Sequence, residues 1–66
     1  MEASSIMYLI REARKYKHDV VLITIQNENI KLDVTEKIEI VDGKTLLYGD
    51  KILINVEHVS IAKIMY

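Results

Sequence analysis

The sequence of 66 residues contains no cysteine, proline, tryptophan or phenylalanine, and only two glycines. Without cysteine the chain can form neither a disulfide nor a thiolate metal site, and its two histidines are too few for a structural zinc site. The near-absence of glycine and proline is unlike a disordered or linker segment. We expect no membrane-spanning segment, because no apolar run is long enough, and a cysteine-free chain fits a cytoplasmic location.

What remains is a short chain that is 50% hydrophobic and nearly neutral. Residues 1–66 form one domain, because this length leaves no room for a second. A domain of this size buries only about 60% of its unfolded surface and usually needs a disulfide, a metal or self-association. Since the first two are excluded, we expect a homo-oligomer. The net charge of -1 argues against a strongly basic nucleic-acid module but permits local basic patches.

The first segment predicts an amphipathic helix over residues 4–17, capped by Ser4 or Ser5. Apolar residues at helical spacing form its core-facing stripe: Ile6, Leu9, Ile10 and Ala13. Basic residues gather toward its end, where a helix favours positive charge: Arg11, Arg14, Lys15 and Lys17. These basic side chains either bind phosphate groups or form an ordinary solvated face. His18 is expected to be a cation at the helix end or a solvated linker residue.

The rest of the chain alternates apolar and polar residues, as half-buried strands do. The alternation predicts five strands, over residues 20–26, 30–41, 44–48, 51–56 and 59–64. The second strand is long for a small domain and must bend, and Glu36, which breaks its alternation, is the expected bend. Asp42-Gly43 predicts a two-residue hairpin turn, and Gly49-Asp50 predicts a second tight turn.

The alternation changes phase before the last strand. Ile52, Ile54 and Val56 share one parity, but Val59 and Ile61 fall on the other. A strand cannot change parity without a turn or a bulge, so we expect one at Glu57-His58. The predicted class is α+β, mostly β: an N-terminal amphipathic helix followed by a strongly bent, five-stranded antiparallel small barrel.

No group of residues has the pattern of a catalytic site, so we expect a non-enzymatic protein without cofactor or bound metal. His58 is the residue with the strongest case for function, because side chains at its turn reach one rim of a small barrel. It is either a partly buried histidine bonded to backbone or a contact to a base or a partner. The acidic residues within 33–42 are interpreted as a solvent face and turn rather than a cation site. The four tyrosines either stack on bases or pack against a neighbouring subunit.

Four short segments have counterparts, in the same order, in one known family. Ile10–Arg14 resembles an arginine-rich helix, Asn29–Leu32 a Gly-Ile-Lys-Leu strand opening, Glu39–Leu47 an acidic turn, and Val56–Ile61 a Tyr-Lys-His segment. On these segments the chain resembles the Sm-like family and, within it, the bacterial Hfq group. The resemblance implies an SH3-like barrel, a ring of subunits joined edge to edge, and binding of single-stranded RNA.

The resemblance also suggests which residues contact RNA. Of the family's RNA-binding positions, His58, Arg11 and Arg14 carry over, whereas Glu57 stands where the family has lysine and Gly43-Lys44 where it has Gln-Phe. In the first hypothesis the protein is a ring that binds single-stranded RNA. Its candidate residues are His58, Lys44 and Tyr48 on one surface and Arg11, Arg14 and Lys17 along phosphates at the rim. In the second hypothesis the same oligomer docks a protein partner and binds no RNA.

Overall fold

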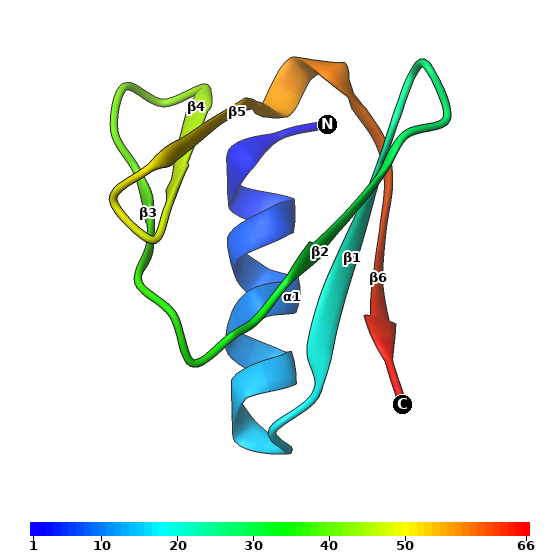
Figure 1. Cartoon of the computed structure of the whole chain (residues 1–66), viewed down its shortest axis with the longest axis vertical. Helices are drawn as coiled ribbons and strands as arrows, with labels where there is room; N and C mark the ends of the chain where they lie inside the picture. Colours follow the sequence, from blue (N-terminus) through cyan, green and yellow to red (C-terminus); the bar gives the residue numbers. More distant parts are fainter.

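A computed structural model describes all residues of the chain, 1–66, as one helix and six strands (Figure 1). Helix α1 covers Ala3–Lys15, and a short 3-10 helix, η1, covers Val56–His58. The strands are β1 (Asp19–Thr24), β2 (Asn29–Leu32), β3 (Ile38–Ile40), β4 (Thr45–Tyr48), β5 (Ile52–Asn55) and β6 (Val59–Met65). The α+β class expected from the sequence is confirmed.

The strands form two antiparallel sheets of three strands each, ordered β2-β1-β6 and β3-β4-β5. No hydrogen-bonded strand pair joins the two sheets, so the structure does not show a closed five-stranded barrel. Strand β1 is central in its sheet and pairs with β6, the last strand of the chain. Helix α1 lies between the two sheets in Figure 1 and contacts β1 and β6.

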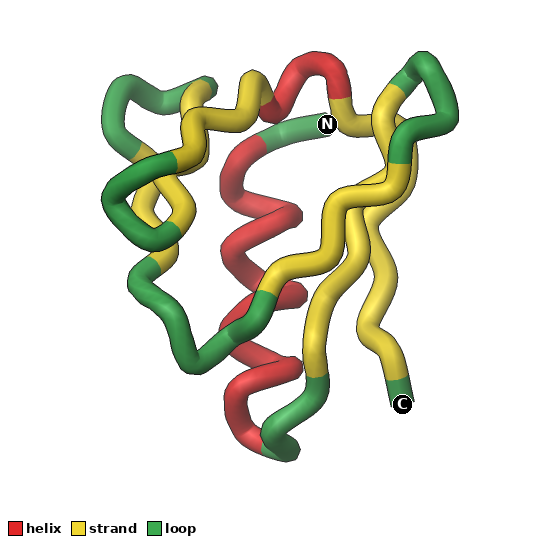
Figure 2. The backbone as a smooth tube through the Cα atoms, in the orientation of Figure 1, coloured by secondary structure: helices red, strands yellow, loops and turns green.

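The prediction of a single strand over residues 30–41 is wrong, because a bend at residues 33–37 separates β2 from β3. The Glu36 N–H donates to the Asp33 carbonyl (3.1 Å), which closes a turn. The Asp33 carboxylate accepts from the N–H (2.9 Å) and the hydroxyl (2.7 Å) of Thr35. These local hydrogen bonds replace strand pairing. The bend therefore occurs where Glu36 indicated it, and Figure 2 shows it as a loop at the opposite end of the molecule from η1.

The helix begins earlier and ends earlier than residues 4–17. Glu2 is the N-cap and makes no side-chain cap, so the expected capping by Ser4 or Ser5 is wrong, since both lie inside the first turn. At the other end, Lys17 adopts a left-handed backbone (φ 59°). The N–H of Lys17 donates to Arg14 O (3.4 Å) and that of His18 to Ala13 O (3.0 Å), which is the Schellman pattern that ends a helix.

The turn at Asp42-Gly43 is present but longer than two residues. The loop between β3 and β4 spans residues 41–44. A hydrogen bond from the Val41 N–H to Thr45 O (2.9 Å) closes this loop. The Asp42 carboxylate accepts from the Lys44 N–H (3.1 Å) and the Thr45 hydroxyl (3.0 Å). These bonds fix residues that a two-residue turn would leave in the strand, so β4 begins one residue later than expected.

The other two turn predictions are confirmed. Gly49 and Asp50 both have positive φ (62° and 65°), as the central residues of a primed turn require. Before the last strand, η1 changes the phase of the alternation, with the Asn55 side chain accepting from the Glu57 N–H (2.9 Å). As a result Val56 and Val59, of opposite parity, are both buried.

The hydrophobic core contains twelve buried residues, all of them apolar. The helix contributes Ile6, Ile10 and Ala13, and the remaining members come from both sheets, the bend and η1. No buried side-chain polar atom lacks a hydrogen-bond partner. Leu9, expected in the core stripe, is only half-buried and lines a surface pocket instead.

Candidate functional site

Lys44 and His58 lie at the same end of the molecule. The loop that carries Lys44 and the turn η1 are both at the top of Figure 1, and the Val56 N–H donates to Lys44 O (3.0 Å). Both side chains are exposed. The interpretation of His58 as a partly buried histidine bonded to backbone is therefore wrong; its ring makes no hydrogen bond, and only its carbonyl accepts, from the Ile25 N–H (2.8 Å).

Tyr48 is not part of this end of the molecule. It lies at the opposite end of β4 from Lys44, and its hydroxyl oxygen accepts a hydrogen bond from the Asp33 N–H (2.9 Å). Tyr48 therefore ties the β4 hairpin to the bend. Within one chain, the structure brings together two of the three residues expected on one surface.

Arg14 contacts the backbone of the bend. Its Nε donates to Val34 O (2.9 Å) and its Nη2 donates to Glu36 O (3.2 Å). Two N–H donors of the guanidinium thus bond carbonyls that have no strand partner, because they lie in the bend. The residue predicted to track phosphate has a clear structural function.

Arg11 and Lys17 are exposed on the helix and form neither an ion pair nor a side-chain hydrogen bond. Lys17 lies at the C-terminal end of α1, which is at the bottom of Figure 1, away from η1. Any ligand that used both Lys17 and His58 would have to extend along the length of the molecule.

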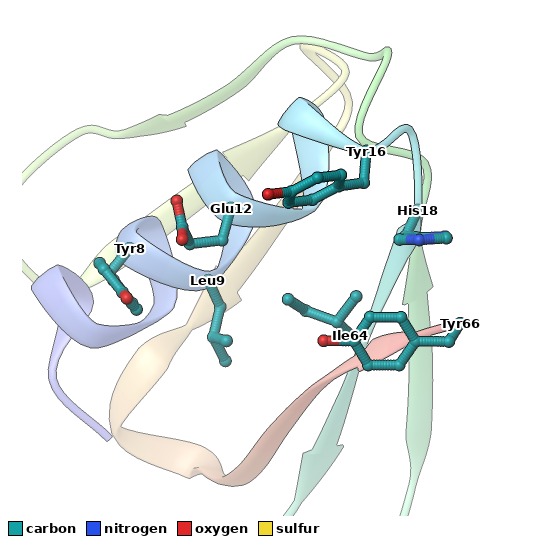
Figure 3. A pocket seen from close by; sticks show the side chains of 7 residues that line it. All are labelled: Tyr8, Leu9, Glu12, Tyr16, His18, Ile64 and Tyr66. Carbon is teal, nitrogen blue, oxygen red and sulfur yellow. The ribbon is translucent and has the colours of Figure 1, made fainter.

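A pocket of about 270 Å³ lies between the outer face of α1 and the end of β6 (Figure 3). Four of its seven lining residues come from α1 and its end, two from β6 and beyond, and one from the loop before β1. They are Tyr8, Leu9, Glu12, Tyr16, His18, Ile64 and Tyr66. Three of the four tyrosines of the chain thus meet at one site.

The ring of His18 packs against the rings of Tyr16 and Tyr66 at one end of this pocket. Its centroid lies 5.0 Å from that of Tyr66, with the planes at 67°, and 6.5 Å from that of Tyr16, at 29°. Both spacings are in the range where aromatic rings attract one another. In Figure 3 the hydroxyl ends of Tyr16 and Tyr66 both point away from His18. His18 lies in the linker between α1 and β1, but it is half-buried between two rings and so is not the solvated linker residue that the sequence offered as one alternative.

Glu12 supplies the pocket's carboxylate. It pairs with the ammonium of Lys15 (2.6 Å), and its hydrogen bond to that group raises the pKa of Lys15. Lys15 does not line the pocket, and neither does any other lysine or arginine. Sequence reasoning missed this site because Tyr66 lies far from Tyr8 along the chain. A usable signal was the four-residue spacing of Tyr8, Glu12 and Tyr16, which places all three on one helix face.

Asp33 of the bend and Asp42 of the following turn serve as local hydrogen-bond acceptors. Hydrogen bonds from Thr35 lower the pKa of Asp33, and those from the Lys44 backbone and from Thr45 lower the pKa of Asp42. No three histidine, aspartate or glutamate side chains come together as a metal site would need. The structure also contains no helix with the length and apolar character of a membrane span.

Each sheet has two edge strands, β2 and β6 in one and β3 and β5 in the other, and β5 and β6 carry the exposed apolar side chains considered for assembly. Strand β5 pairs only with β4, and β6 pairs only with β1. Both edges carry apolar side chains in contact with solvent: Ile52 (48% exposed) and Leu53 (66%) on β5, and Ile61 (50%) and Met65 (44%) on β6. Exposed apolar edges of this kind favour pairing with another strand.

Searches of protein-family models, of curated protein sequences and of solved structures found no match to this chain.

Proposed function

We propose that the protein is a non-enzymatic, self-assembling module of Sm-like, small-barrel architecture that binds single-stranded RNA. The observation that carries the proposal is the pair of free, apolar strand edges on β5 and β6. When β5 of one copy pairs with β6 of the next, both edges are covered and the contact repeats around a ring. This assembly also supplies the stabilisation that a cysteine-free domain of 66 residues otherwise lacks.

The strand order supports this architecture. Strands β2 and β3 together occupy the place of the one long, bent second strand of such a barrel, and every sequential pair on either side of the bend is antiparallel. The pairing of β1 with β6 returns the end of the chain to its first strand. The bend and η1 are the two places where the chain passes from one sheet to the other.

The RNA-binding residues of the proposal are Lys44 and His58, which share one end of each subunit. A single subunit offers little attraction for phosphate, because its net charge is -1 and Glu57 lines the same pocket as Lys44. A ring repeats the two residues in every subunit, and linked weak sites bind far more tightly than one. RNA binding in this proposal therefore depends on assembly. The cysteine-free composition is consistent with a cytoplasmic protein.

The assembly is tested by the mass of the purified protein, measured by light scattering. Leu53→Lys places a charge on the β5 edge and should reduce a mass of several subunits to that of a monomer. Ile25→Lys is the matched control, since Ile25 is exposed to a similar degree (63%) but lies outside both edges. A wild-type protein that is monomeric at all concentrations would contradict the proposal.

RNA binding is tested with short uridine-rich and adenosine-rich single strands at several salt concentrations. We expect submicromolar affinity that falls steeply with salt, and weaker binding by Lys44→Ala and His58→Ala at unchanged mass. Lys51→Ala is the matched control, because it removes one exposed lysine from the turn at the other end of β4. If Lys44→Ala and His58→Ala bind RNA as tightly as the control does, the RNA part of the proposal fails.

A second function is favoured by the pocket between α1 and β6: an oligomer that docks a protein partner and does not bind RNA. Its aromatic lining and its carboxylate suit a protein ligand better than a phosphate chain. This function predicts an RNA dissociation constant above about 1 µM even at low salt, the level of non-specific binding.

A further inference from the structure

The pocket between α1 and β6 combines three features that select one kind of ligand. Its walls include three tyrosines and His18, its ionised group is the carboxylate of Glu12, and no lysine or arginine lines it. The faces of aromatic rings carry partial negative charge. The rings and the carboxylate therefore attract the same kind of ligand, which is a cation with an apolar or planar surface.

We infer that this pocket binds the guanidinium group of an arginine side chain presented by a protein partner. The volume of about 270 Å³ accommodates one side chain, whereas pockets for drug-sized ligands begin at about 300 Å³. Leu9 and Ile64 supply the apolar contact for the methylene groups that precede the charge.

Arginine fits this lining better than the other organic cations do. A guanidinium is planar, weakly hydrated and stacks on aromatic faces, whereas a lysine ammonium is compact and strongly hydrated. It also presents several N–H donors, and the acceptors at the pocket are the Glu12 carboxylate and the tyrosine hydroxyls shown in Figure 3. A quaternary ammonium has no N–H to donate to them.

The site is separate from the proposed RNA-binding residues. Tyr16 and His18 lie just beyond the C-terminal end of α1, whereas the segments that carry Lys44 and His58 lie at the other end of the molecule. The carboxylate of Glu12 would repel a phosphate group. The inference therefore does not depend on RNA binding, and either can fail without the other.

Lys15 competes with the incoming guanidinium for the carboxylate of Glu12. Its ammonium lies 2.6 Å from Glu12 Oε2, but its side chain is 63% exposed and is not among those that line the pocket. An exposed pair of this kind holds the carboxylate only weakly. An incoming guanidinium shares Glu12 with Lys15 or displaces it, so removal of Lys15 should strengthen binding.

The test is an NMR titration of the full-length, ¹⁵N-labelled protein with the blocked tripeptide acetyl-Gly-Arg-Gly-amide. We expect saturable shifts of the amides of Leu9, His18 and Ile64 at millimolar peptide. The peptide with citrulline, which replaces the guanidinium by a neutral urea of the same shape, should bind at least about fivefold more weakly. The lysine peptide should fall between the two. Equal binding of the arginine and citrulline peptides, or no shifts at the pocket, overturns the inference.

Three variants locate the binding to this pocket. Glu12→Gln should weaken the arginine peptide about threefold to fivefold, and Lys15→Met should strengthen it about twofold or more. Glu28→Gln is the control, because it removes the same charge from an exposed residue away from the pocket and should change nothing. The inference is overturned if Glu12→Gln matches the control or if Lys15→Met binds no more tightly. A second result also overturns the inference: uridine monophosphate shifts the pocket amides and the arginine peptide does not. The pocket would then be a nucleotide site.

Discussion

Arg14 shows how far one side chain can define the shape of a small domain. The carbonyls of Val34 and Glu36 lose strand pairing at the bend, and a carbonyl without a partner destabilises the fold. The guanidinium bonds both of them from the neighbouring helix. Lysine cannot reproduce this contact, since its single ammonium lacks the rigid fork of donors.

We predict that Arg14→Ala lowers the free energy of unfolding by about 1–2 kcal/mol. Arg14→Lys should recover only part of this loss. Arg11→Ala, on the exposed part of the same helix, should change the free energy by less than about 0.5 kcal/mol. Urea unfolding at fixed protein concentration measures all three. Equal stability of Arg14→Ala and Arg11→Ala would show that the bend does not need the guanidinium.

The elements themselves are held by short local motifs at their ends. Helix α1 ends with Lys17 in the left-handed region, a conformation that costs a residue with a Cβ atom about 1–2 kcal/mol. Sequence patterns did not predict this ending, because the residue is lysine and the usual signal for a left-handed cap is glycine. The position is nevertheless fixed by the hydrogen bonds from Lys17 and His18.

Lys17→Gly should therefore stabilise the protein by about 0.5–1 kcal/mol, since glycine adopts positive φ without steric cost. Arg11→Gly, in the interior of the same helix, should destabilise it by about 1 kcal/mol. The two variants make the same kind of substitution six residues apart and should shift the thermal midpoint in opposite directions. A loss of stability in both would contradict the left-handed assignment of Lys17.

The turn between β3 and β4 should be sensitive to acid. Hydrogen bonds from Lys44 and Thr45 hold the pKa of Asp42 below its ordinary value. Because the folded pKa is lower than the unfolded pKa, this group stabilises the fold above about pH 3.9 and loses that contribution as pH falls through the folded value. Asp42→Asn keeps an acceptor but does not titrate. Its thermal midpoint should fall less than that of the wild type between about pH 4 and about pH 2, and parallel curves would contradict the prediction.

The sequence patterns predicted element types better than element lengths. The helix, both glycine-containing turns and the phase change at η1 follow from local spacing, which the structure preserves. The break between β2 and β3 does not follow from spacing, because Leu32, Val34 and Ile38 share one parity and are buried before, within and after the bend. Alternation records which side chains face the core, not whether the backbone stays in a strand. The pocket was missed for a different reason, since Ile64 and Tyr66 reach α1 only through the pairing of β6 with β1.

At the scale of the whole molecule, stability and assembly should be coupled. If the edges of β5 and β6 are covered in an oligomer, only the folded state forms that contact, so mass action stabilises it. We predict that the thermal midpoint of the wild-type protein rises with protein concentration. Leu53→Lys should have a lower midpoint that does not depend on concentration, and Ile25→Lys should behave like the wild type. A wild-type midpoint independent of concentration would argue against assembly through the edges.

The pairing of β1 with β6 has a consequence for how the chain acquires its structure. Val20 lies opposite Ile64, whereas the strands of the other sheet all come from the continuous segment 38–55. Contacts between distant residues form slowly, because a long loop must close first. The hairpins of segment 38–55 and the local pairing of β1 with β2 should therefore form early, and the pairing of β1 with β6 should form later. During synthesis β1 is made before β6, so the polar N–H and C=O groups on that side of β1 have no strand partner until β6 follows.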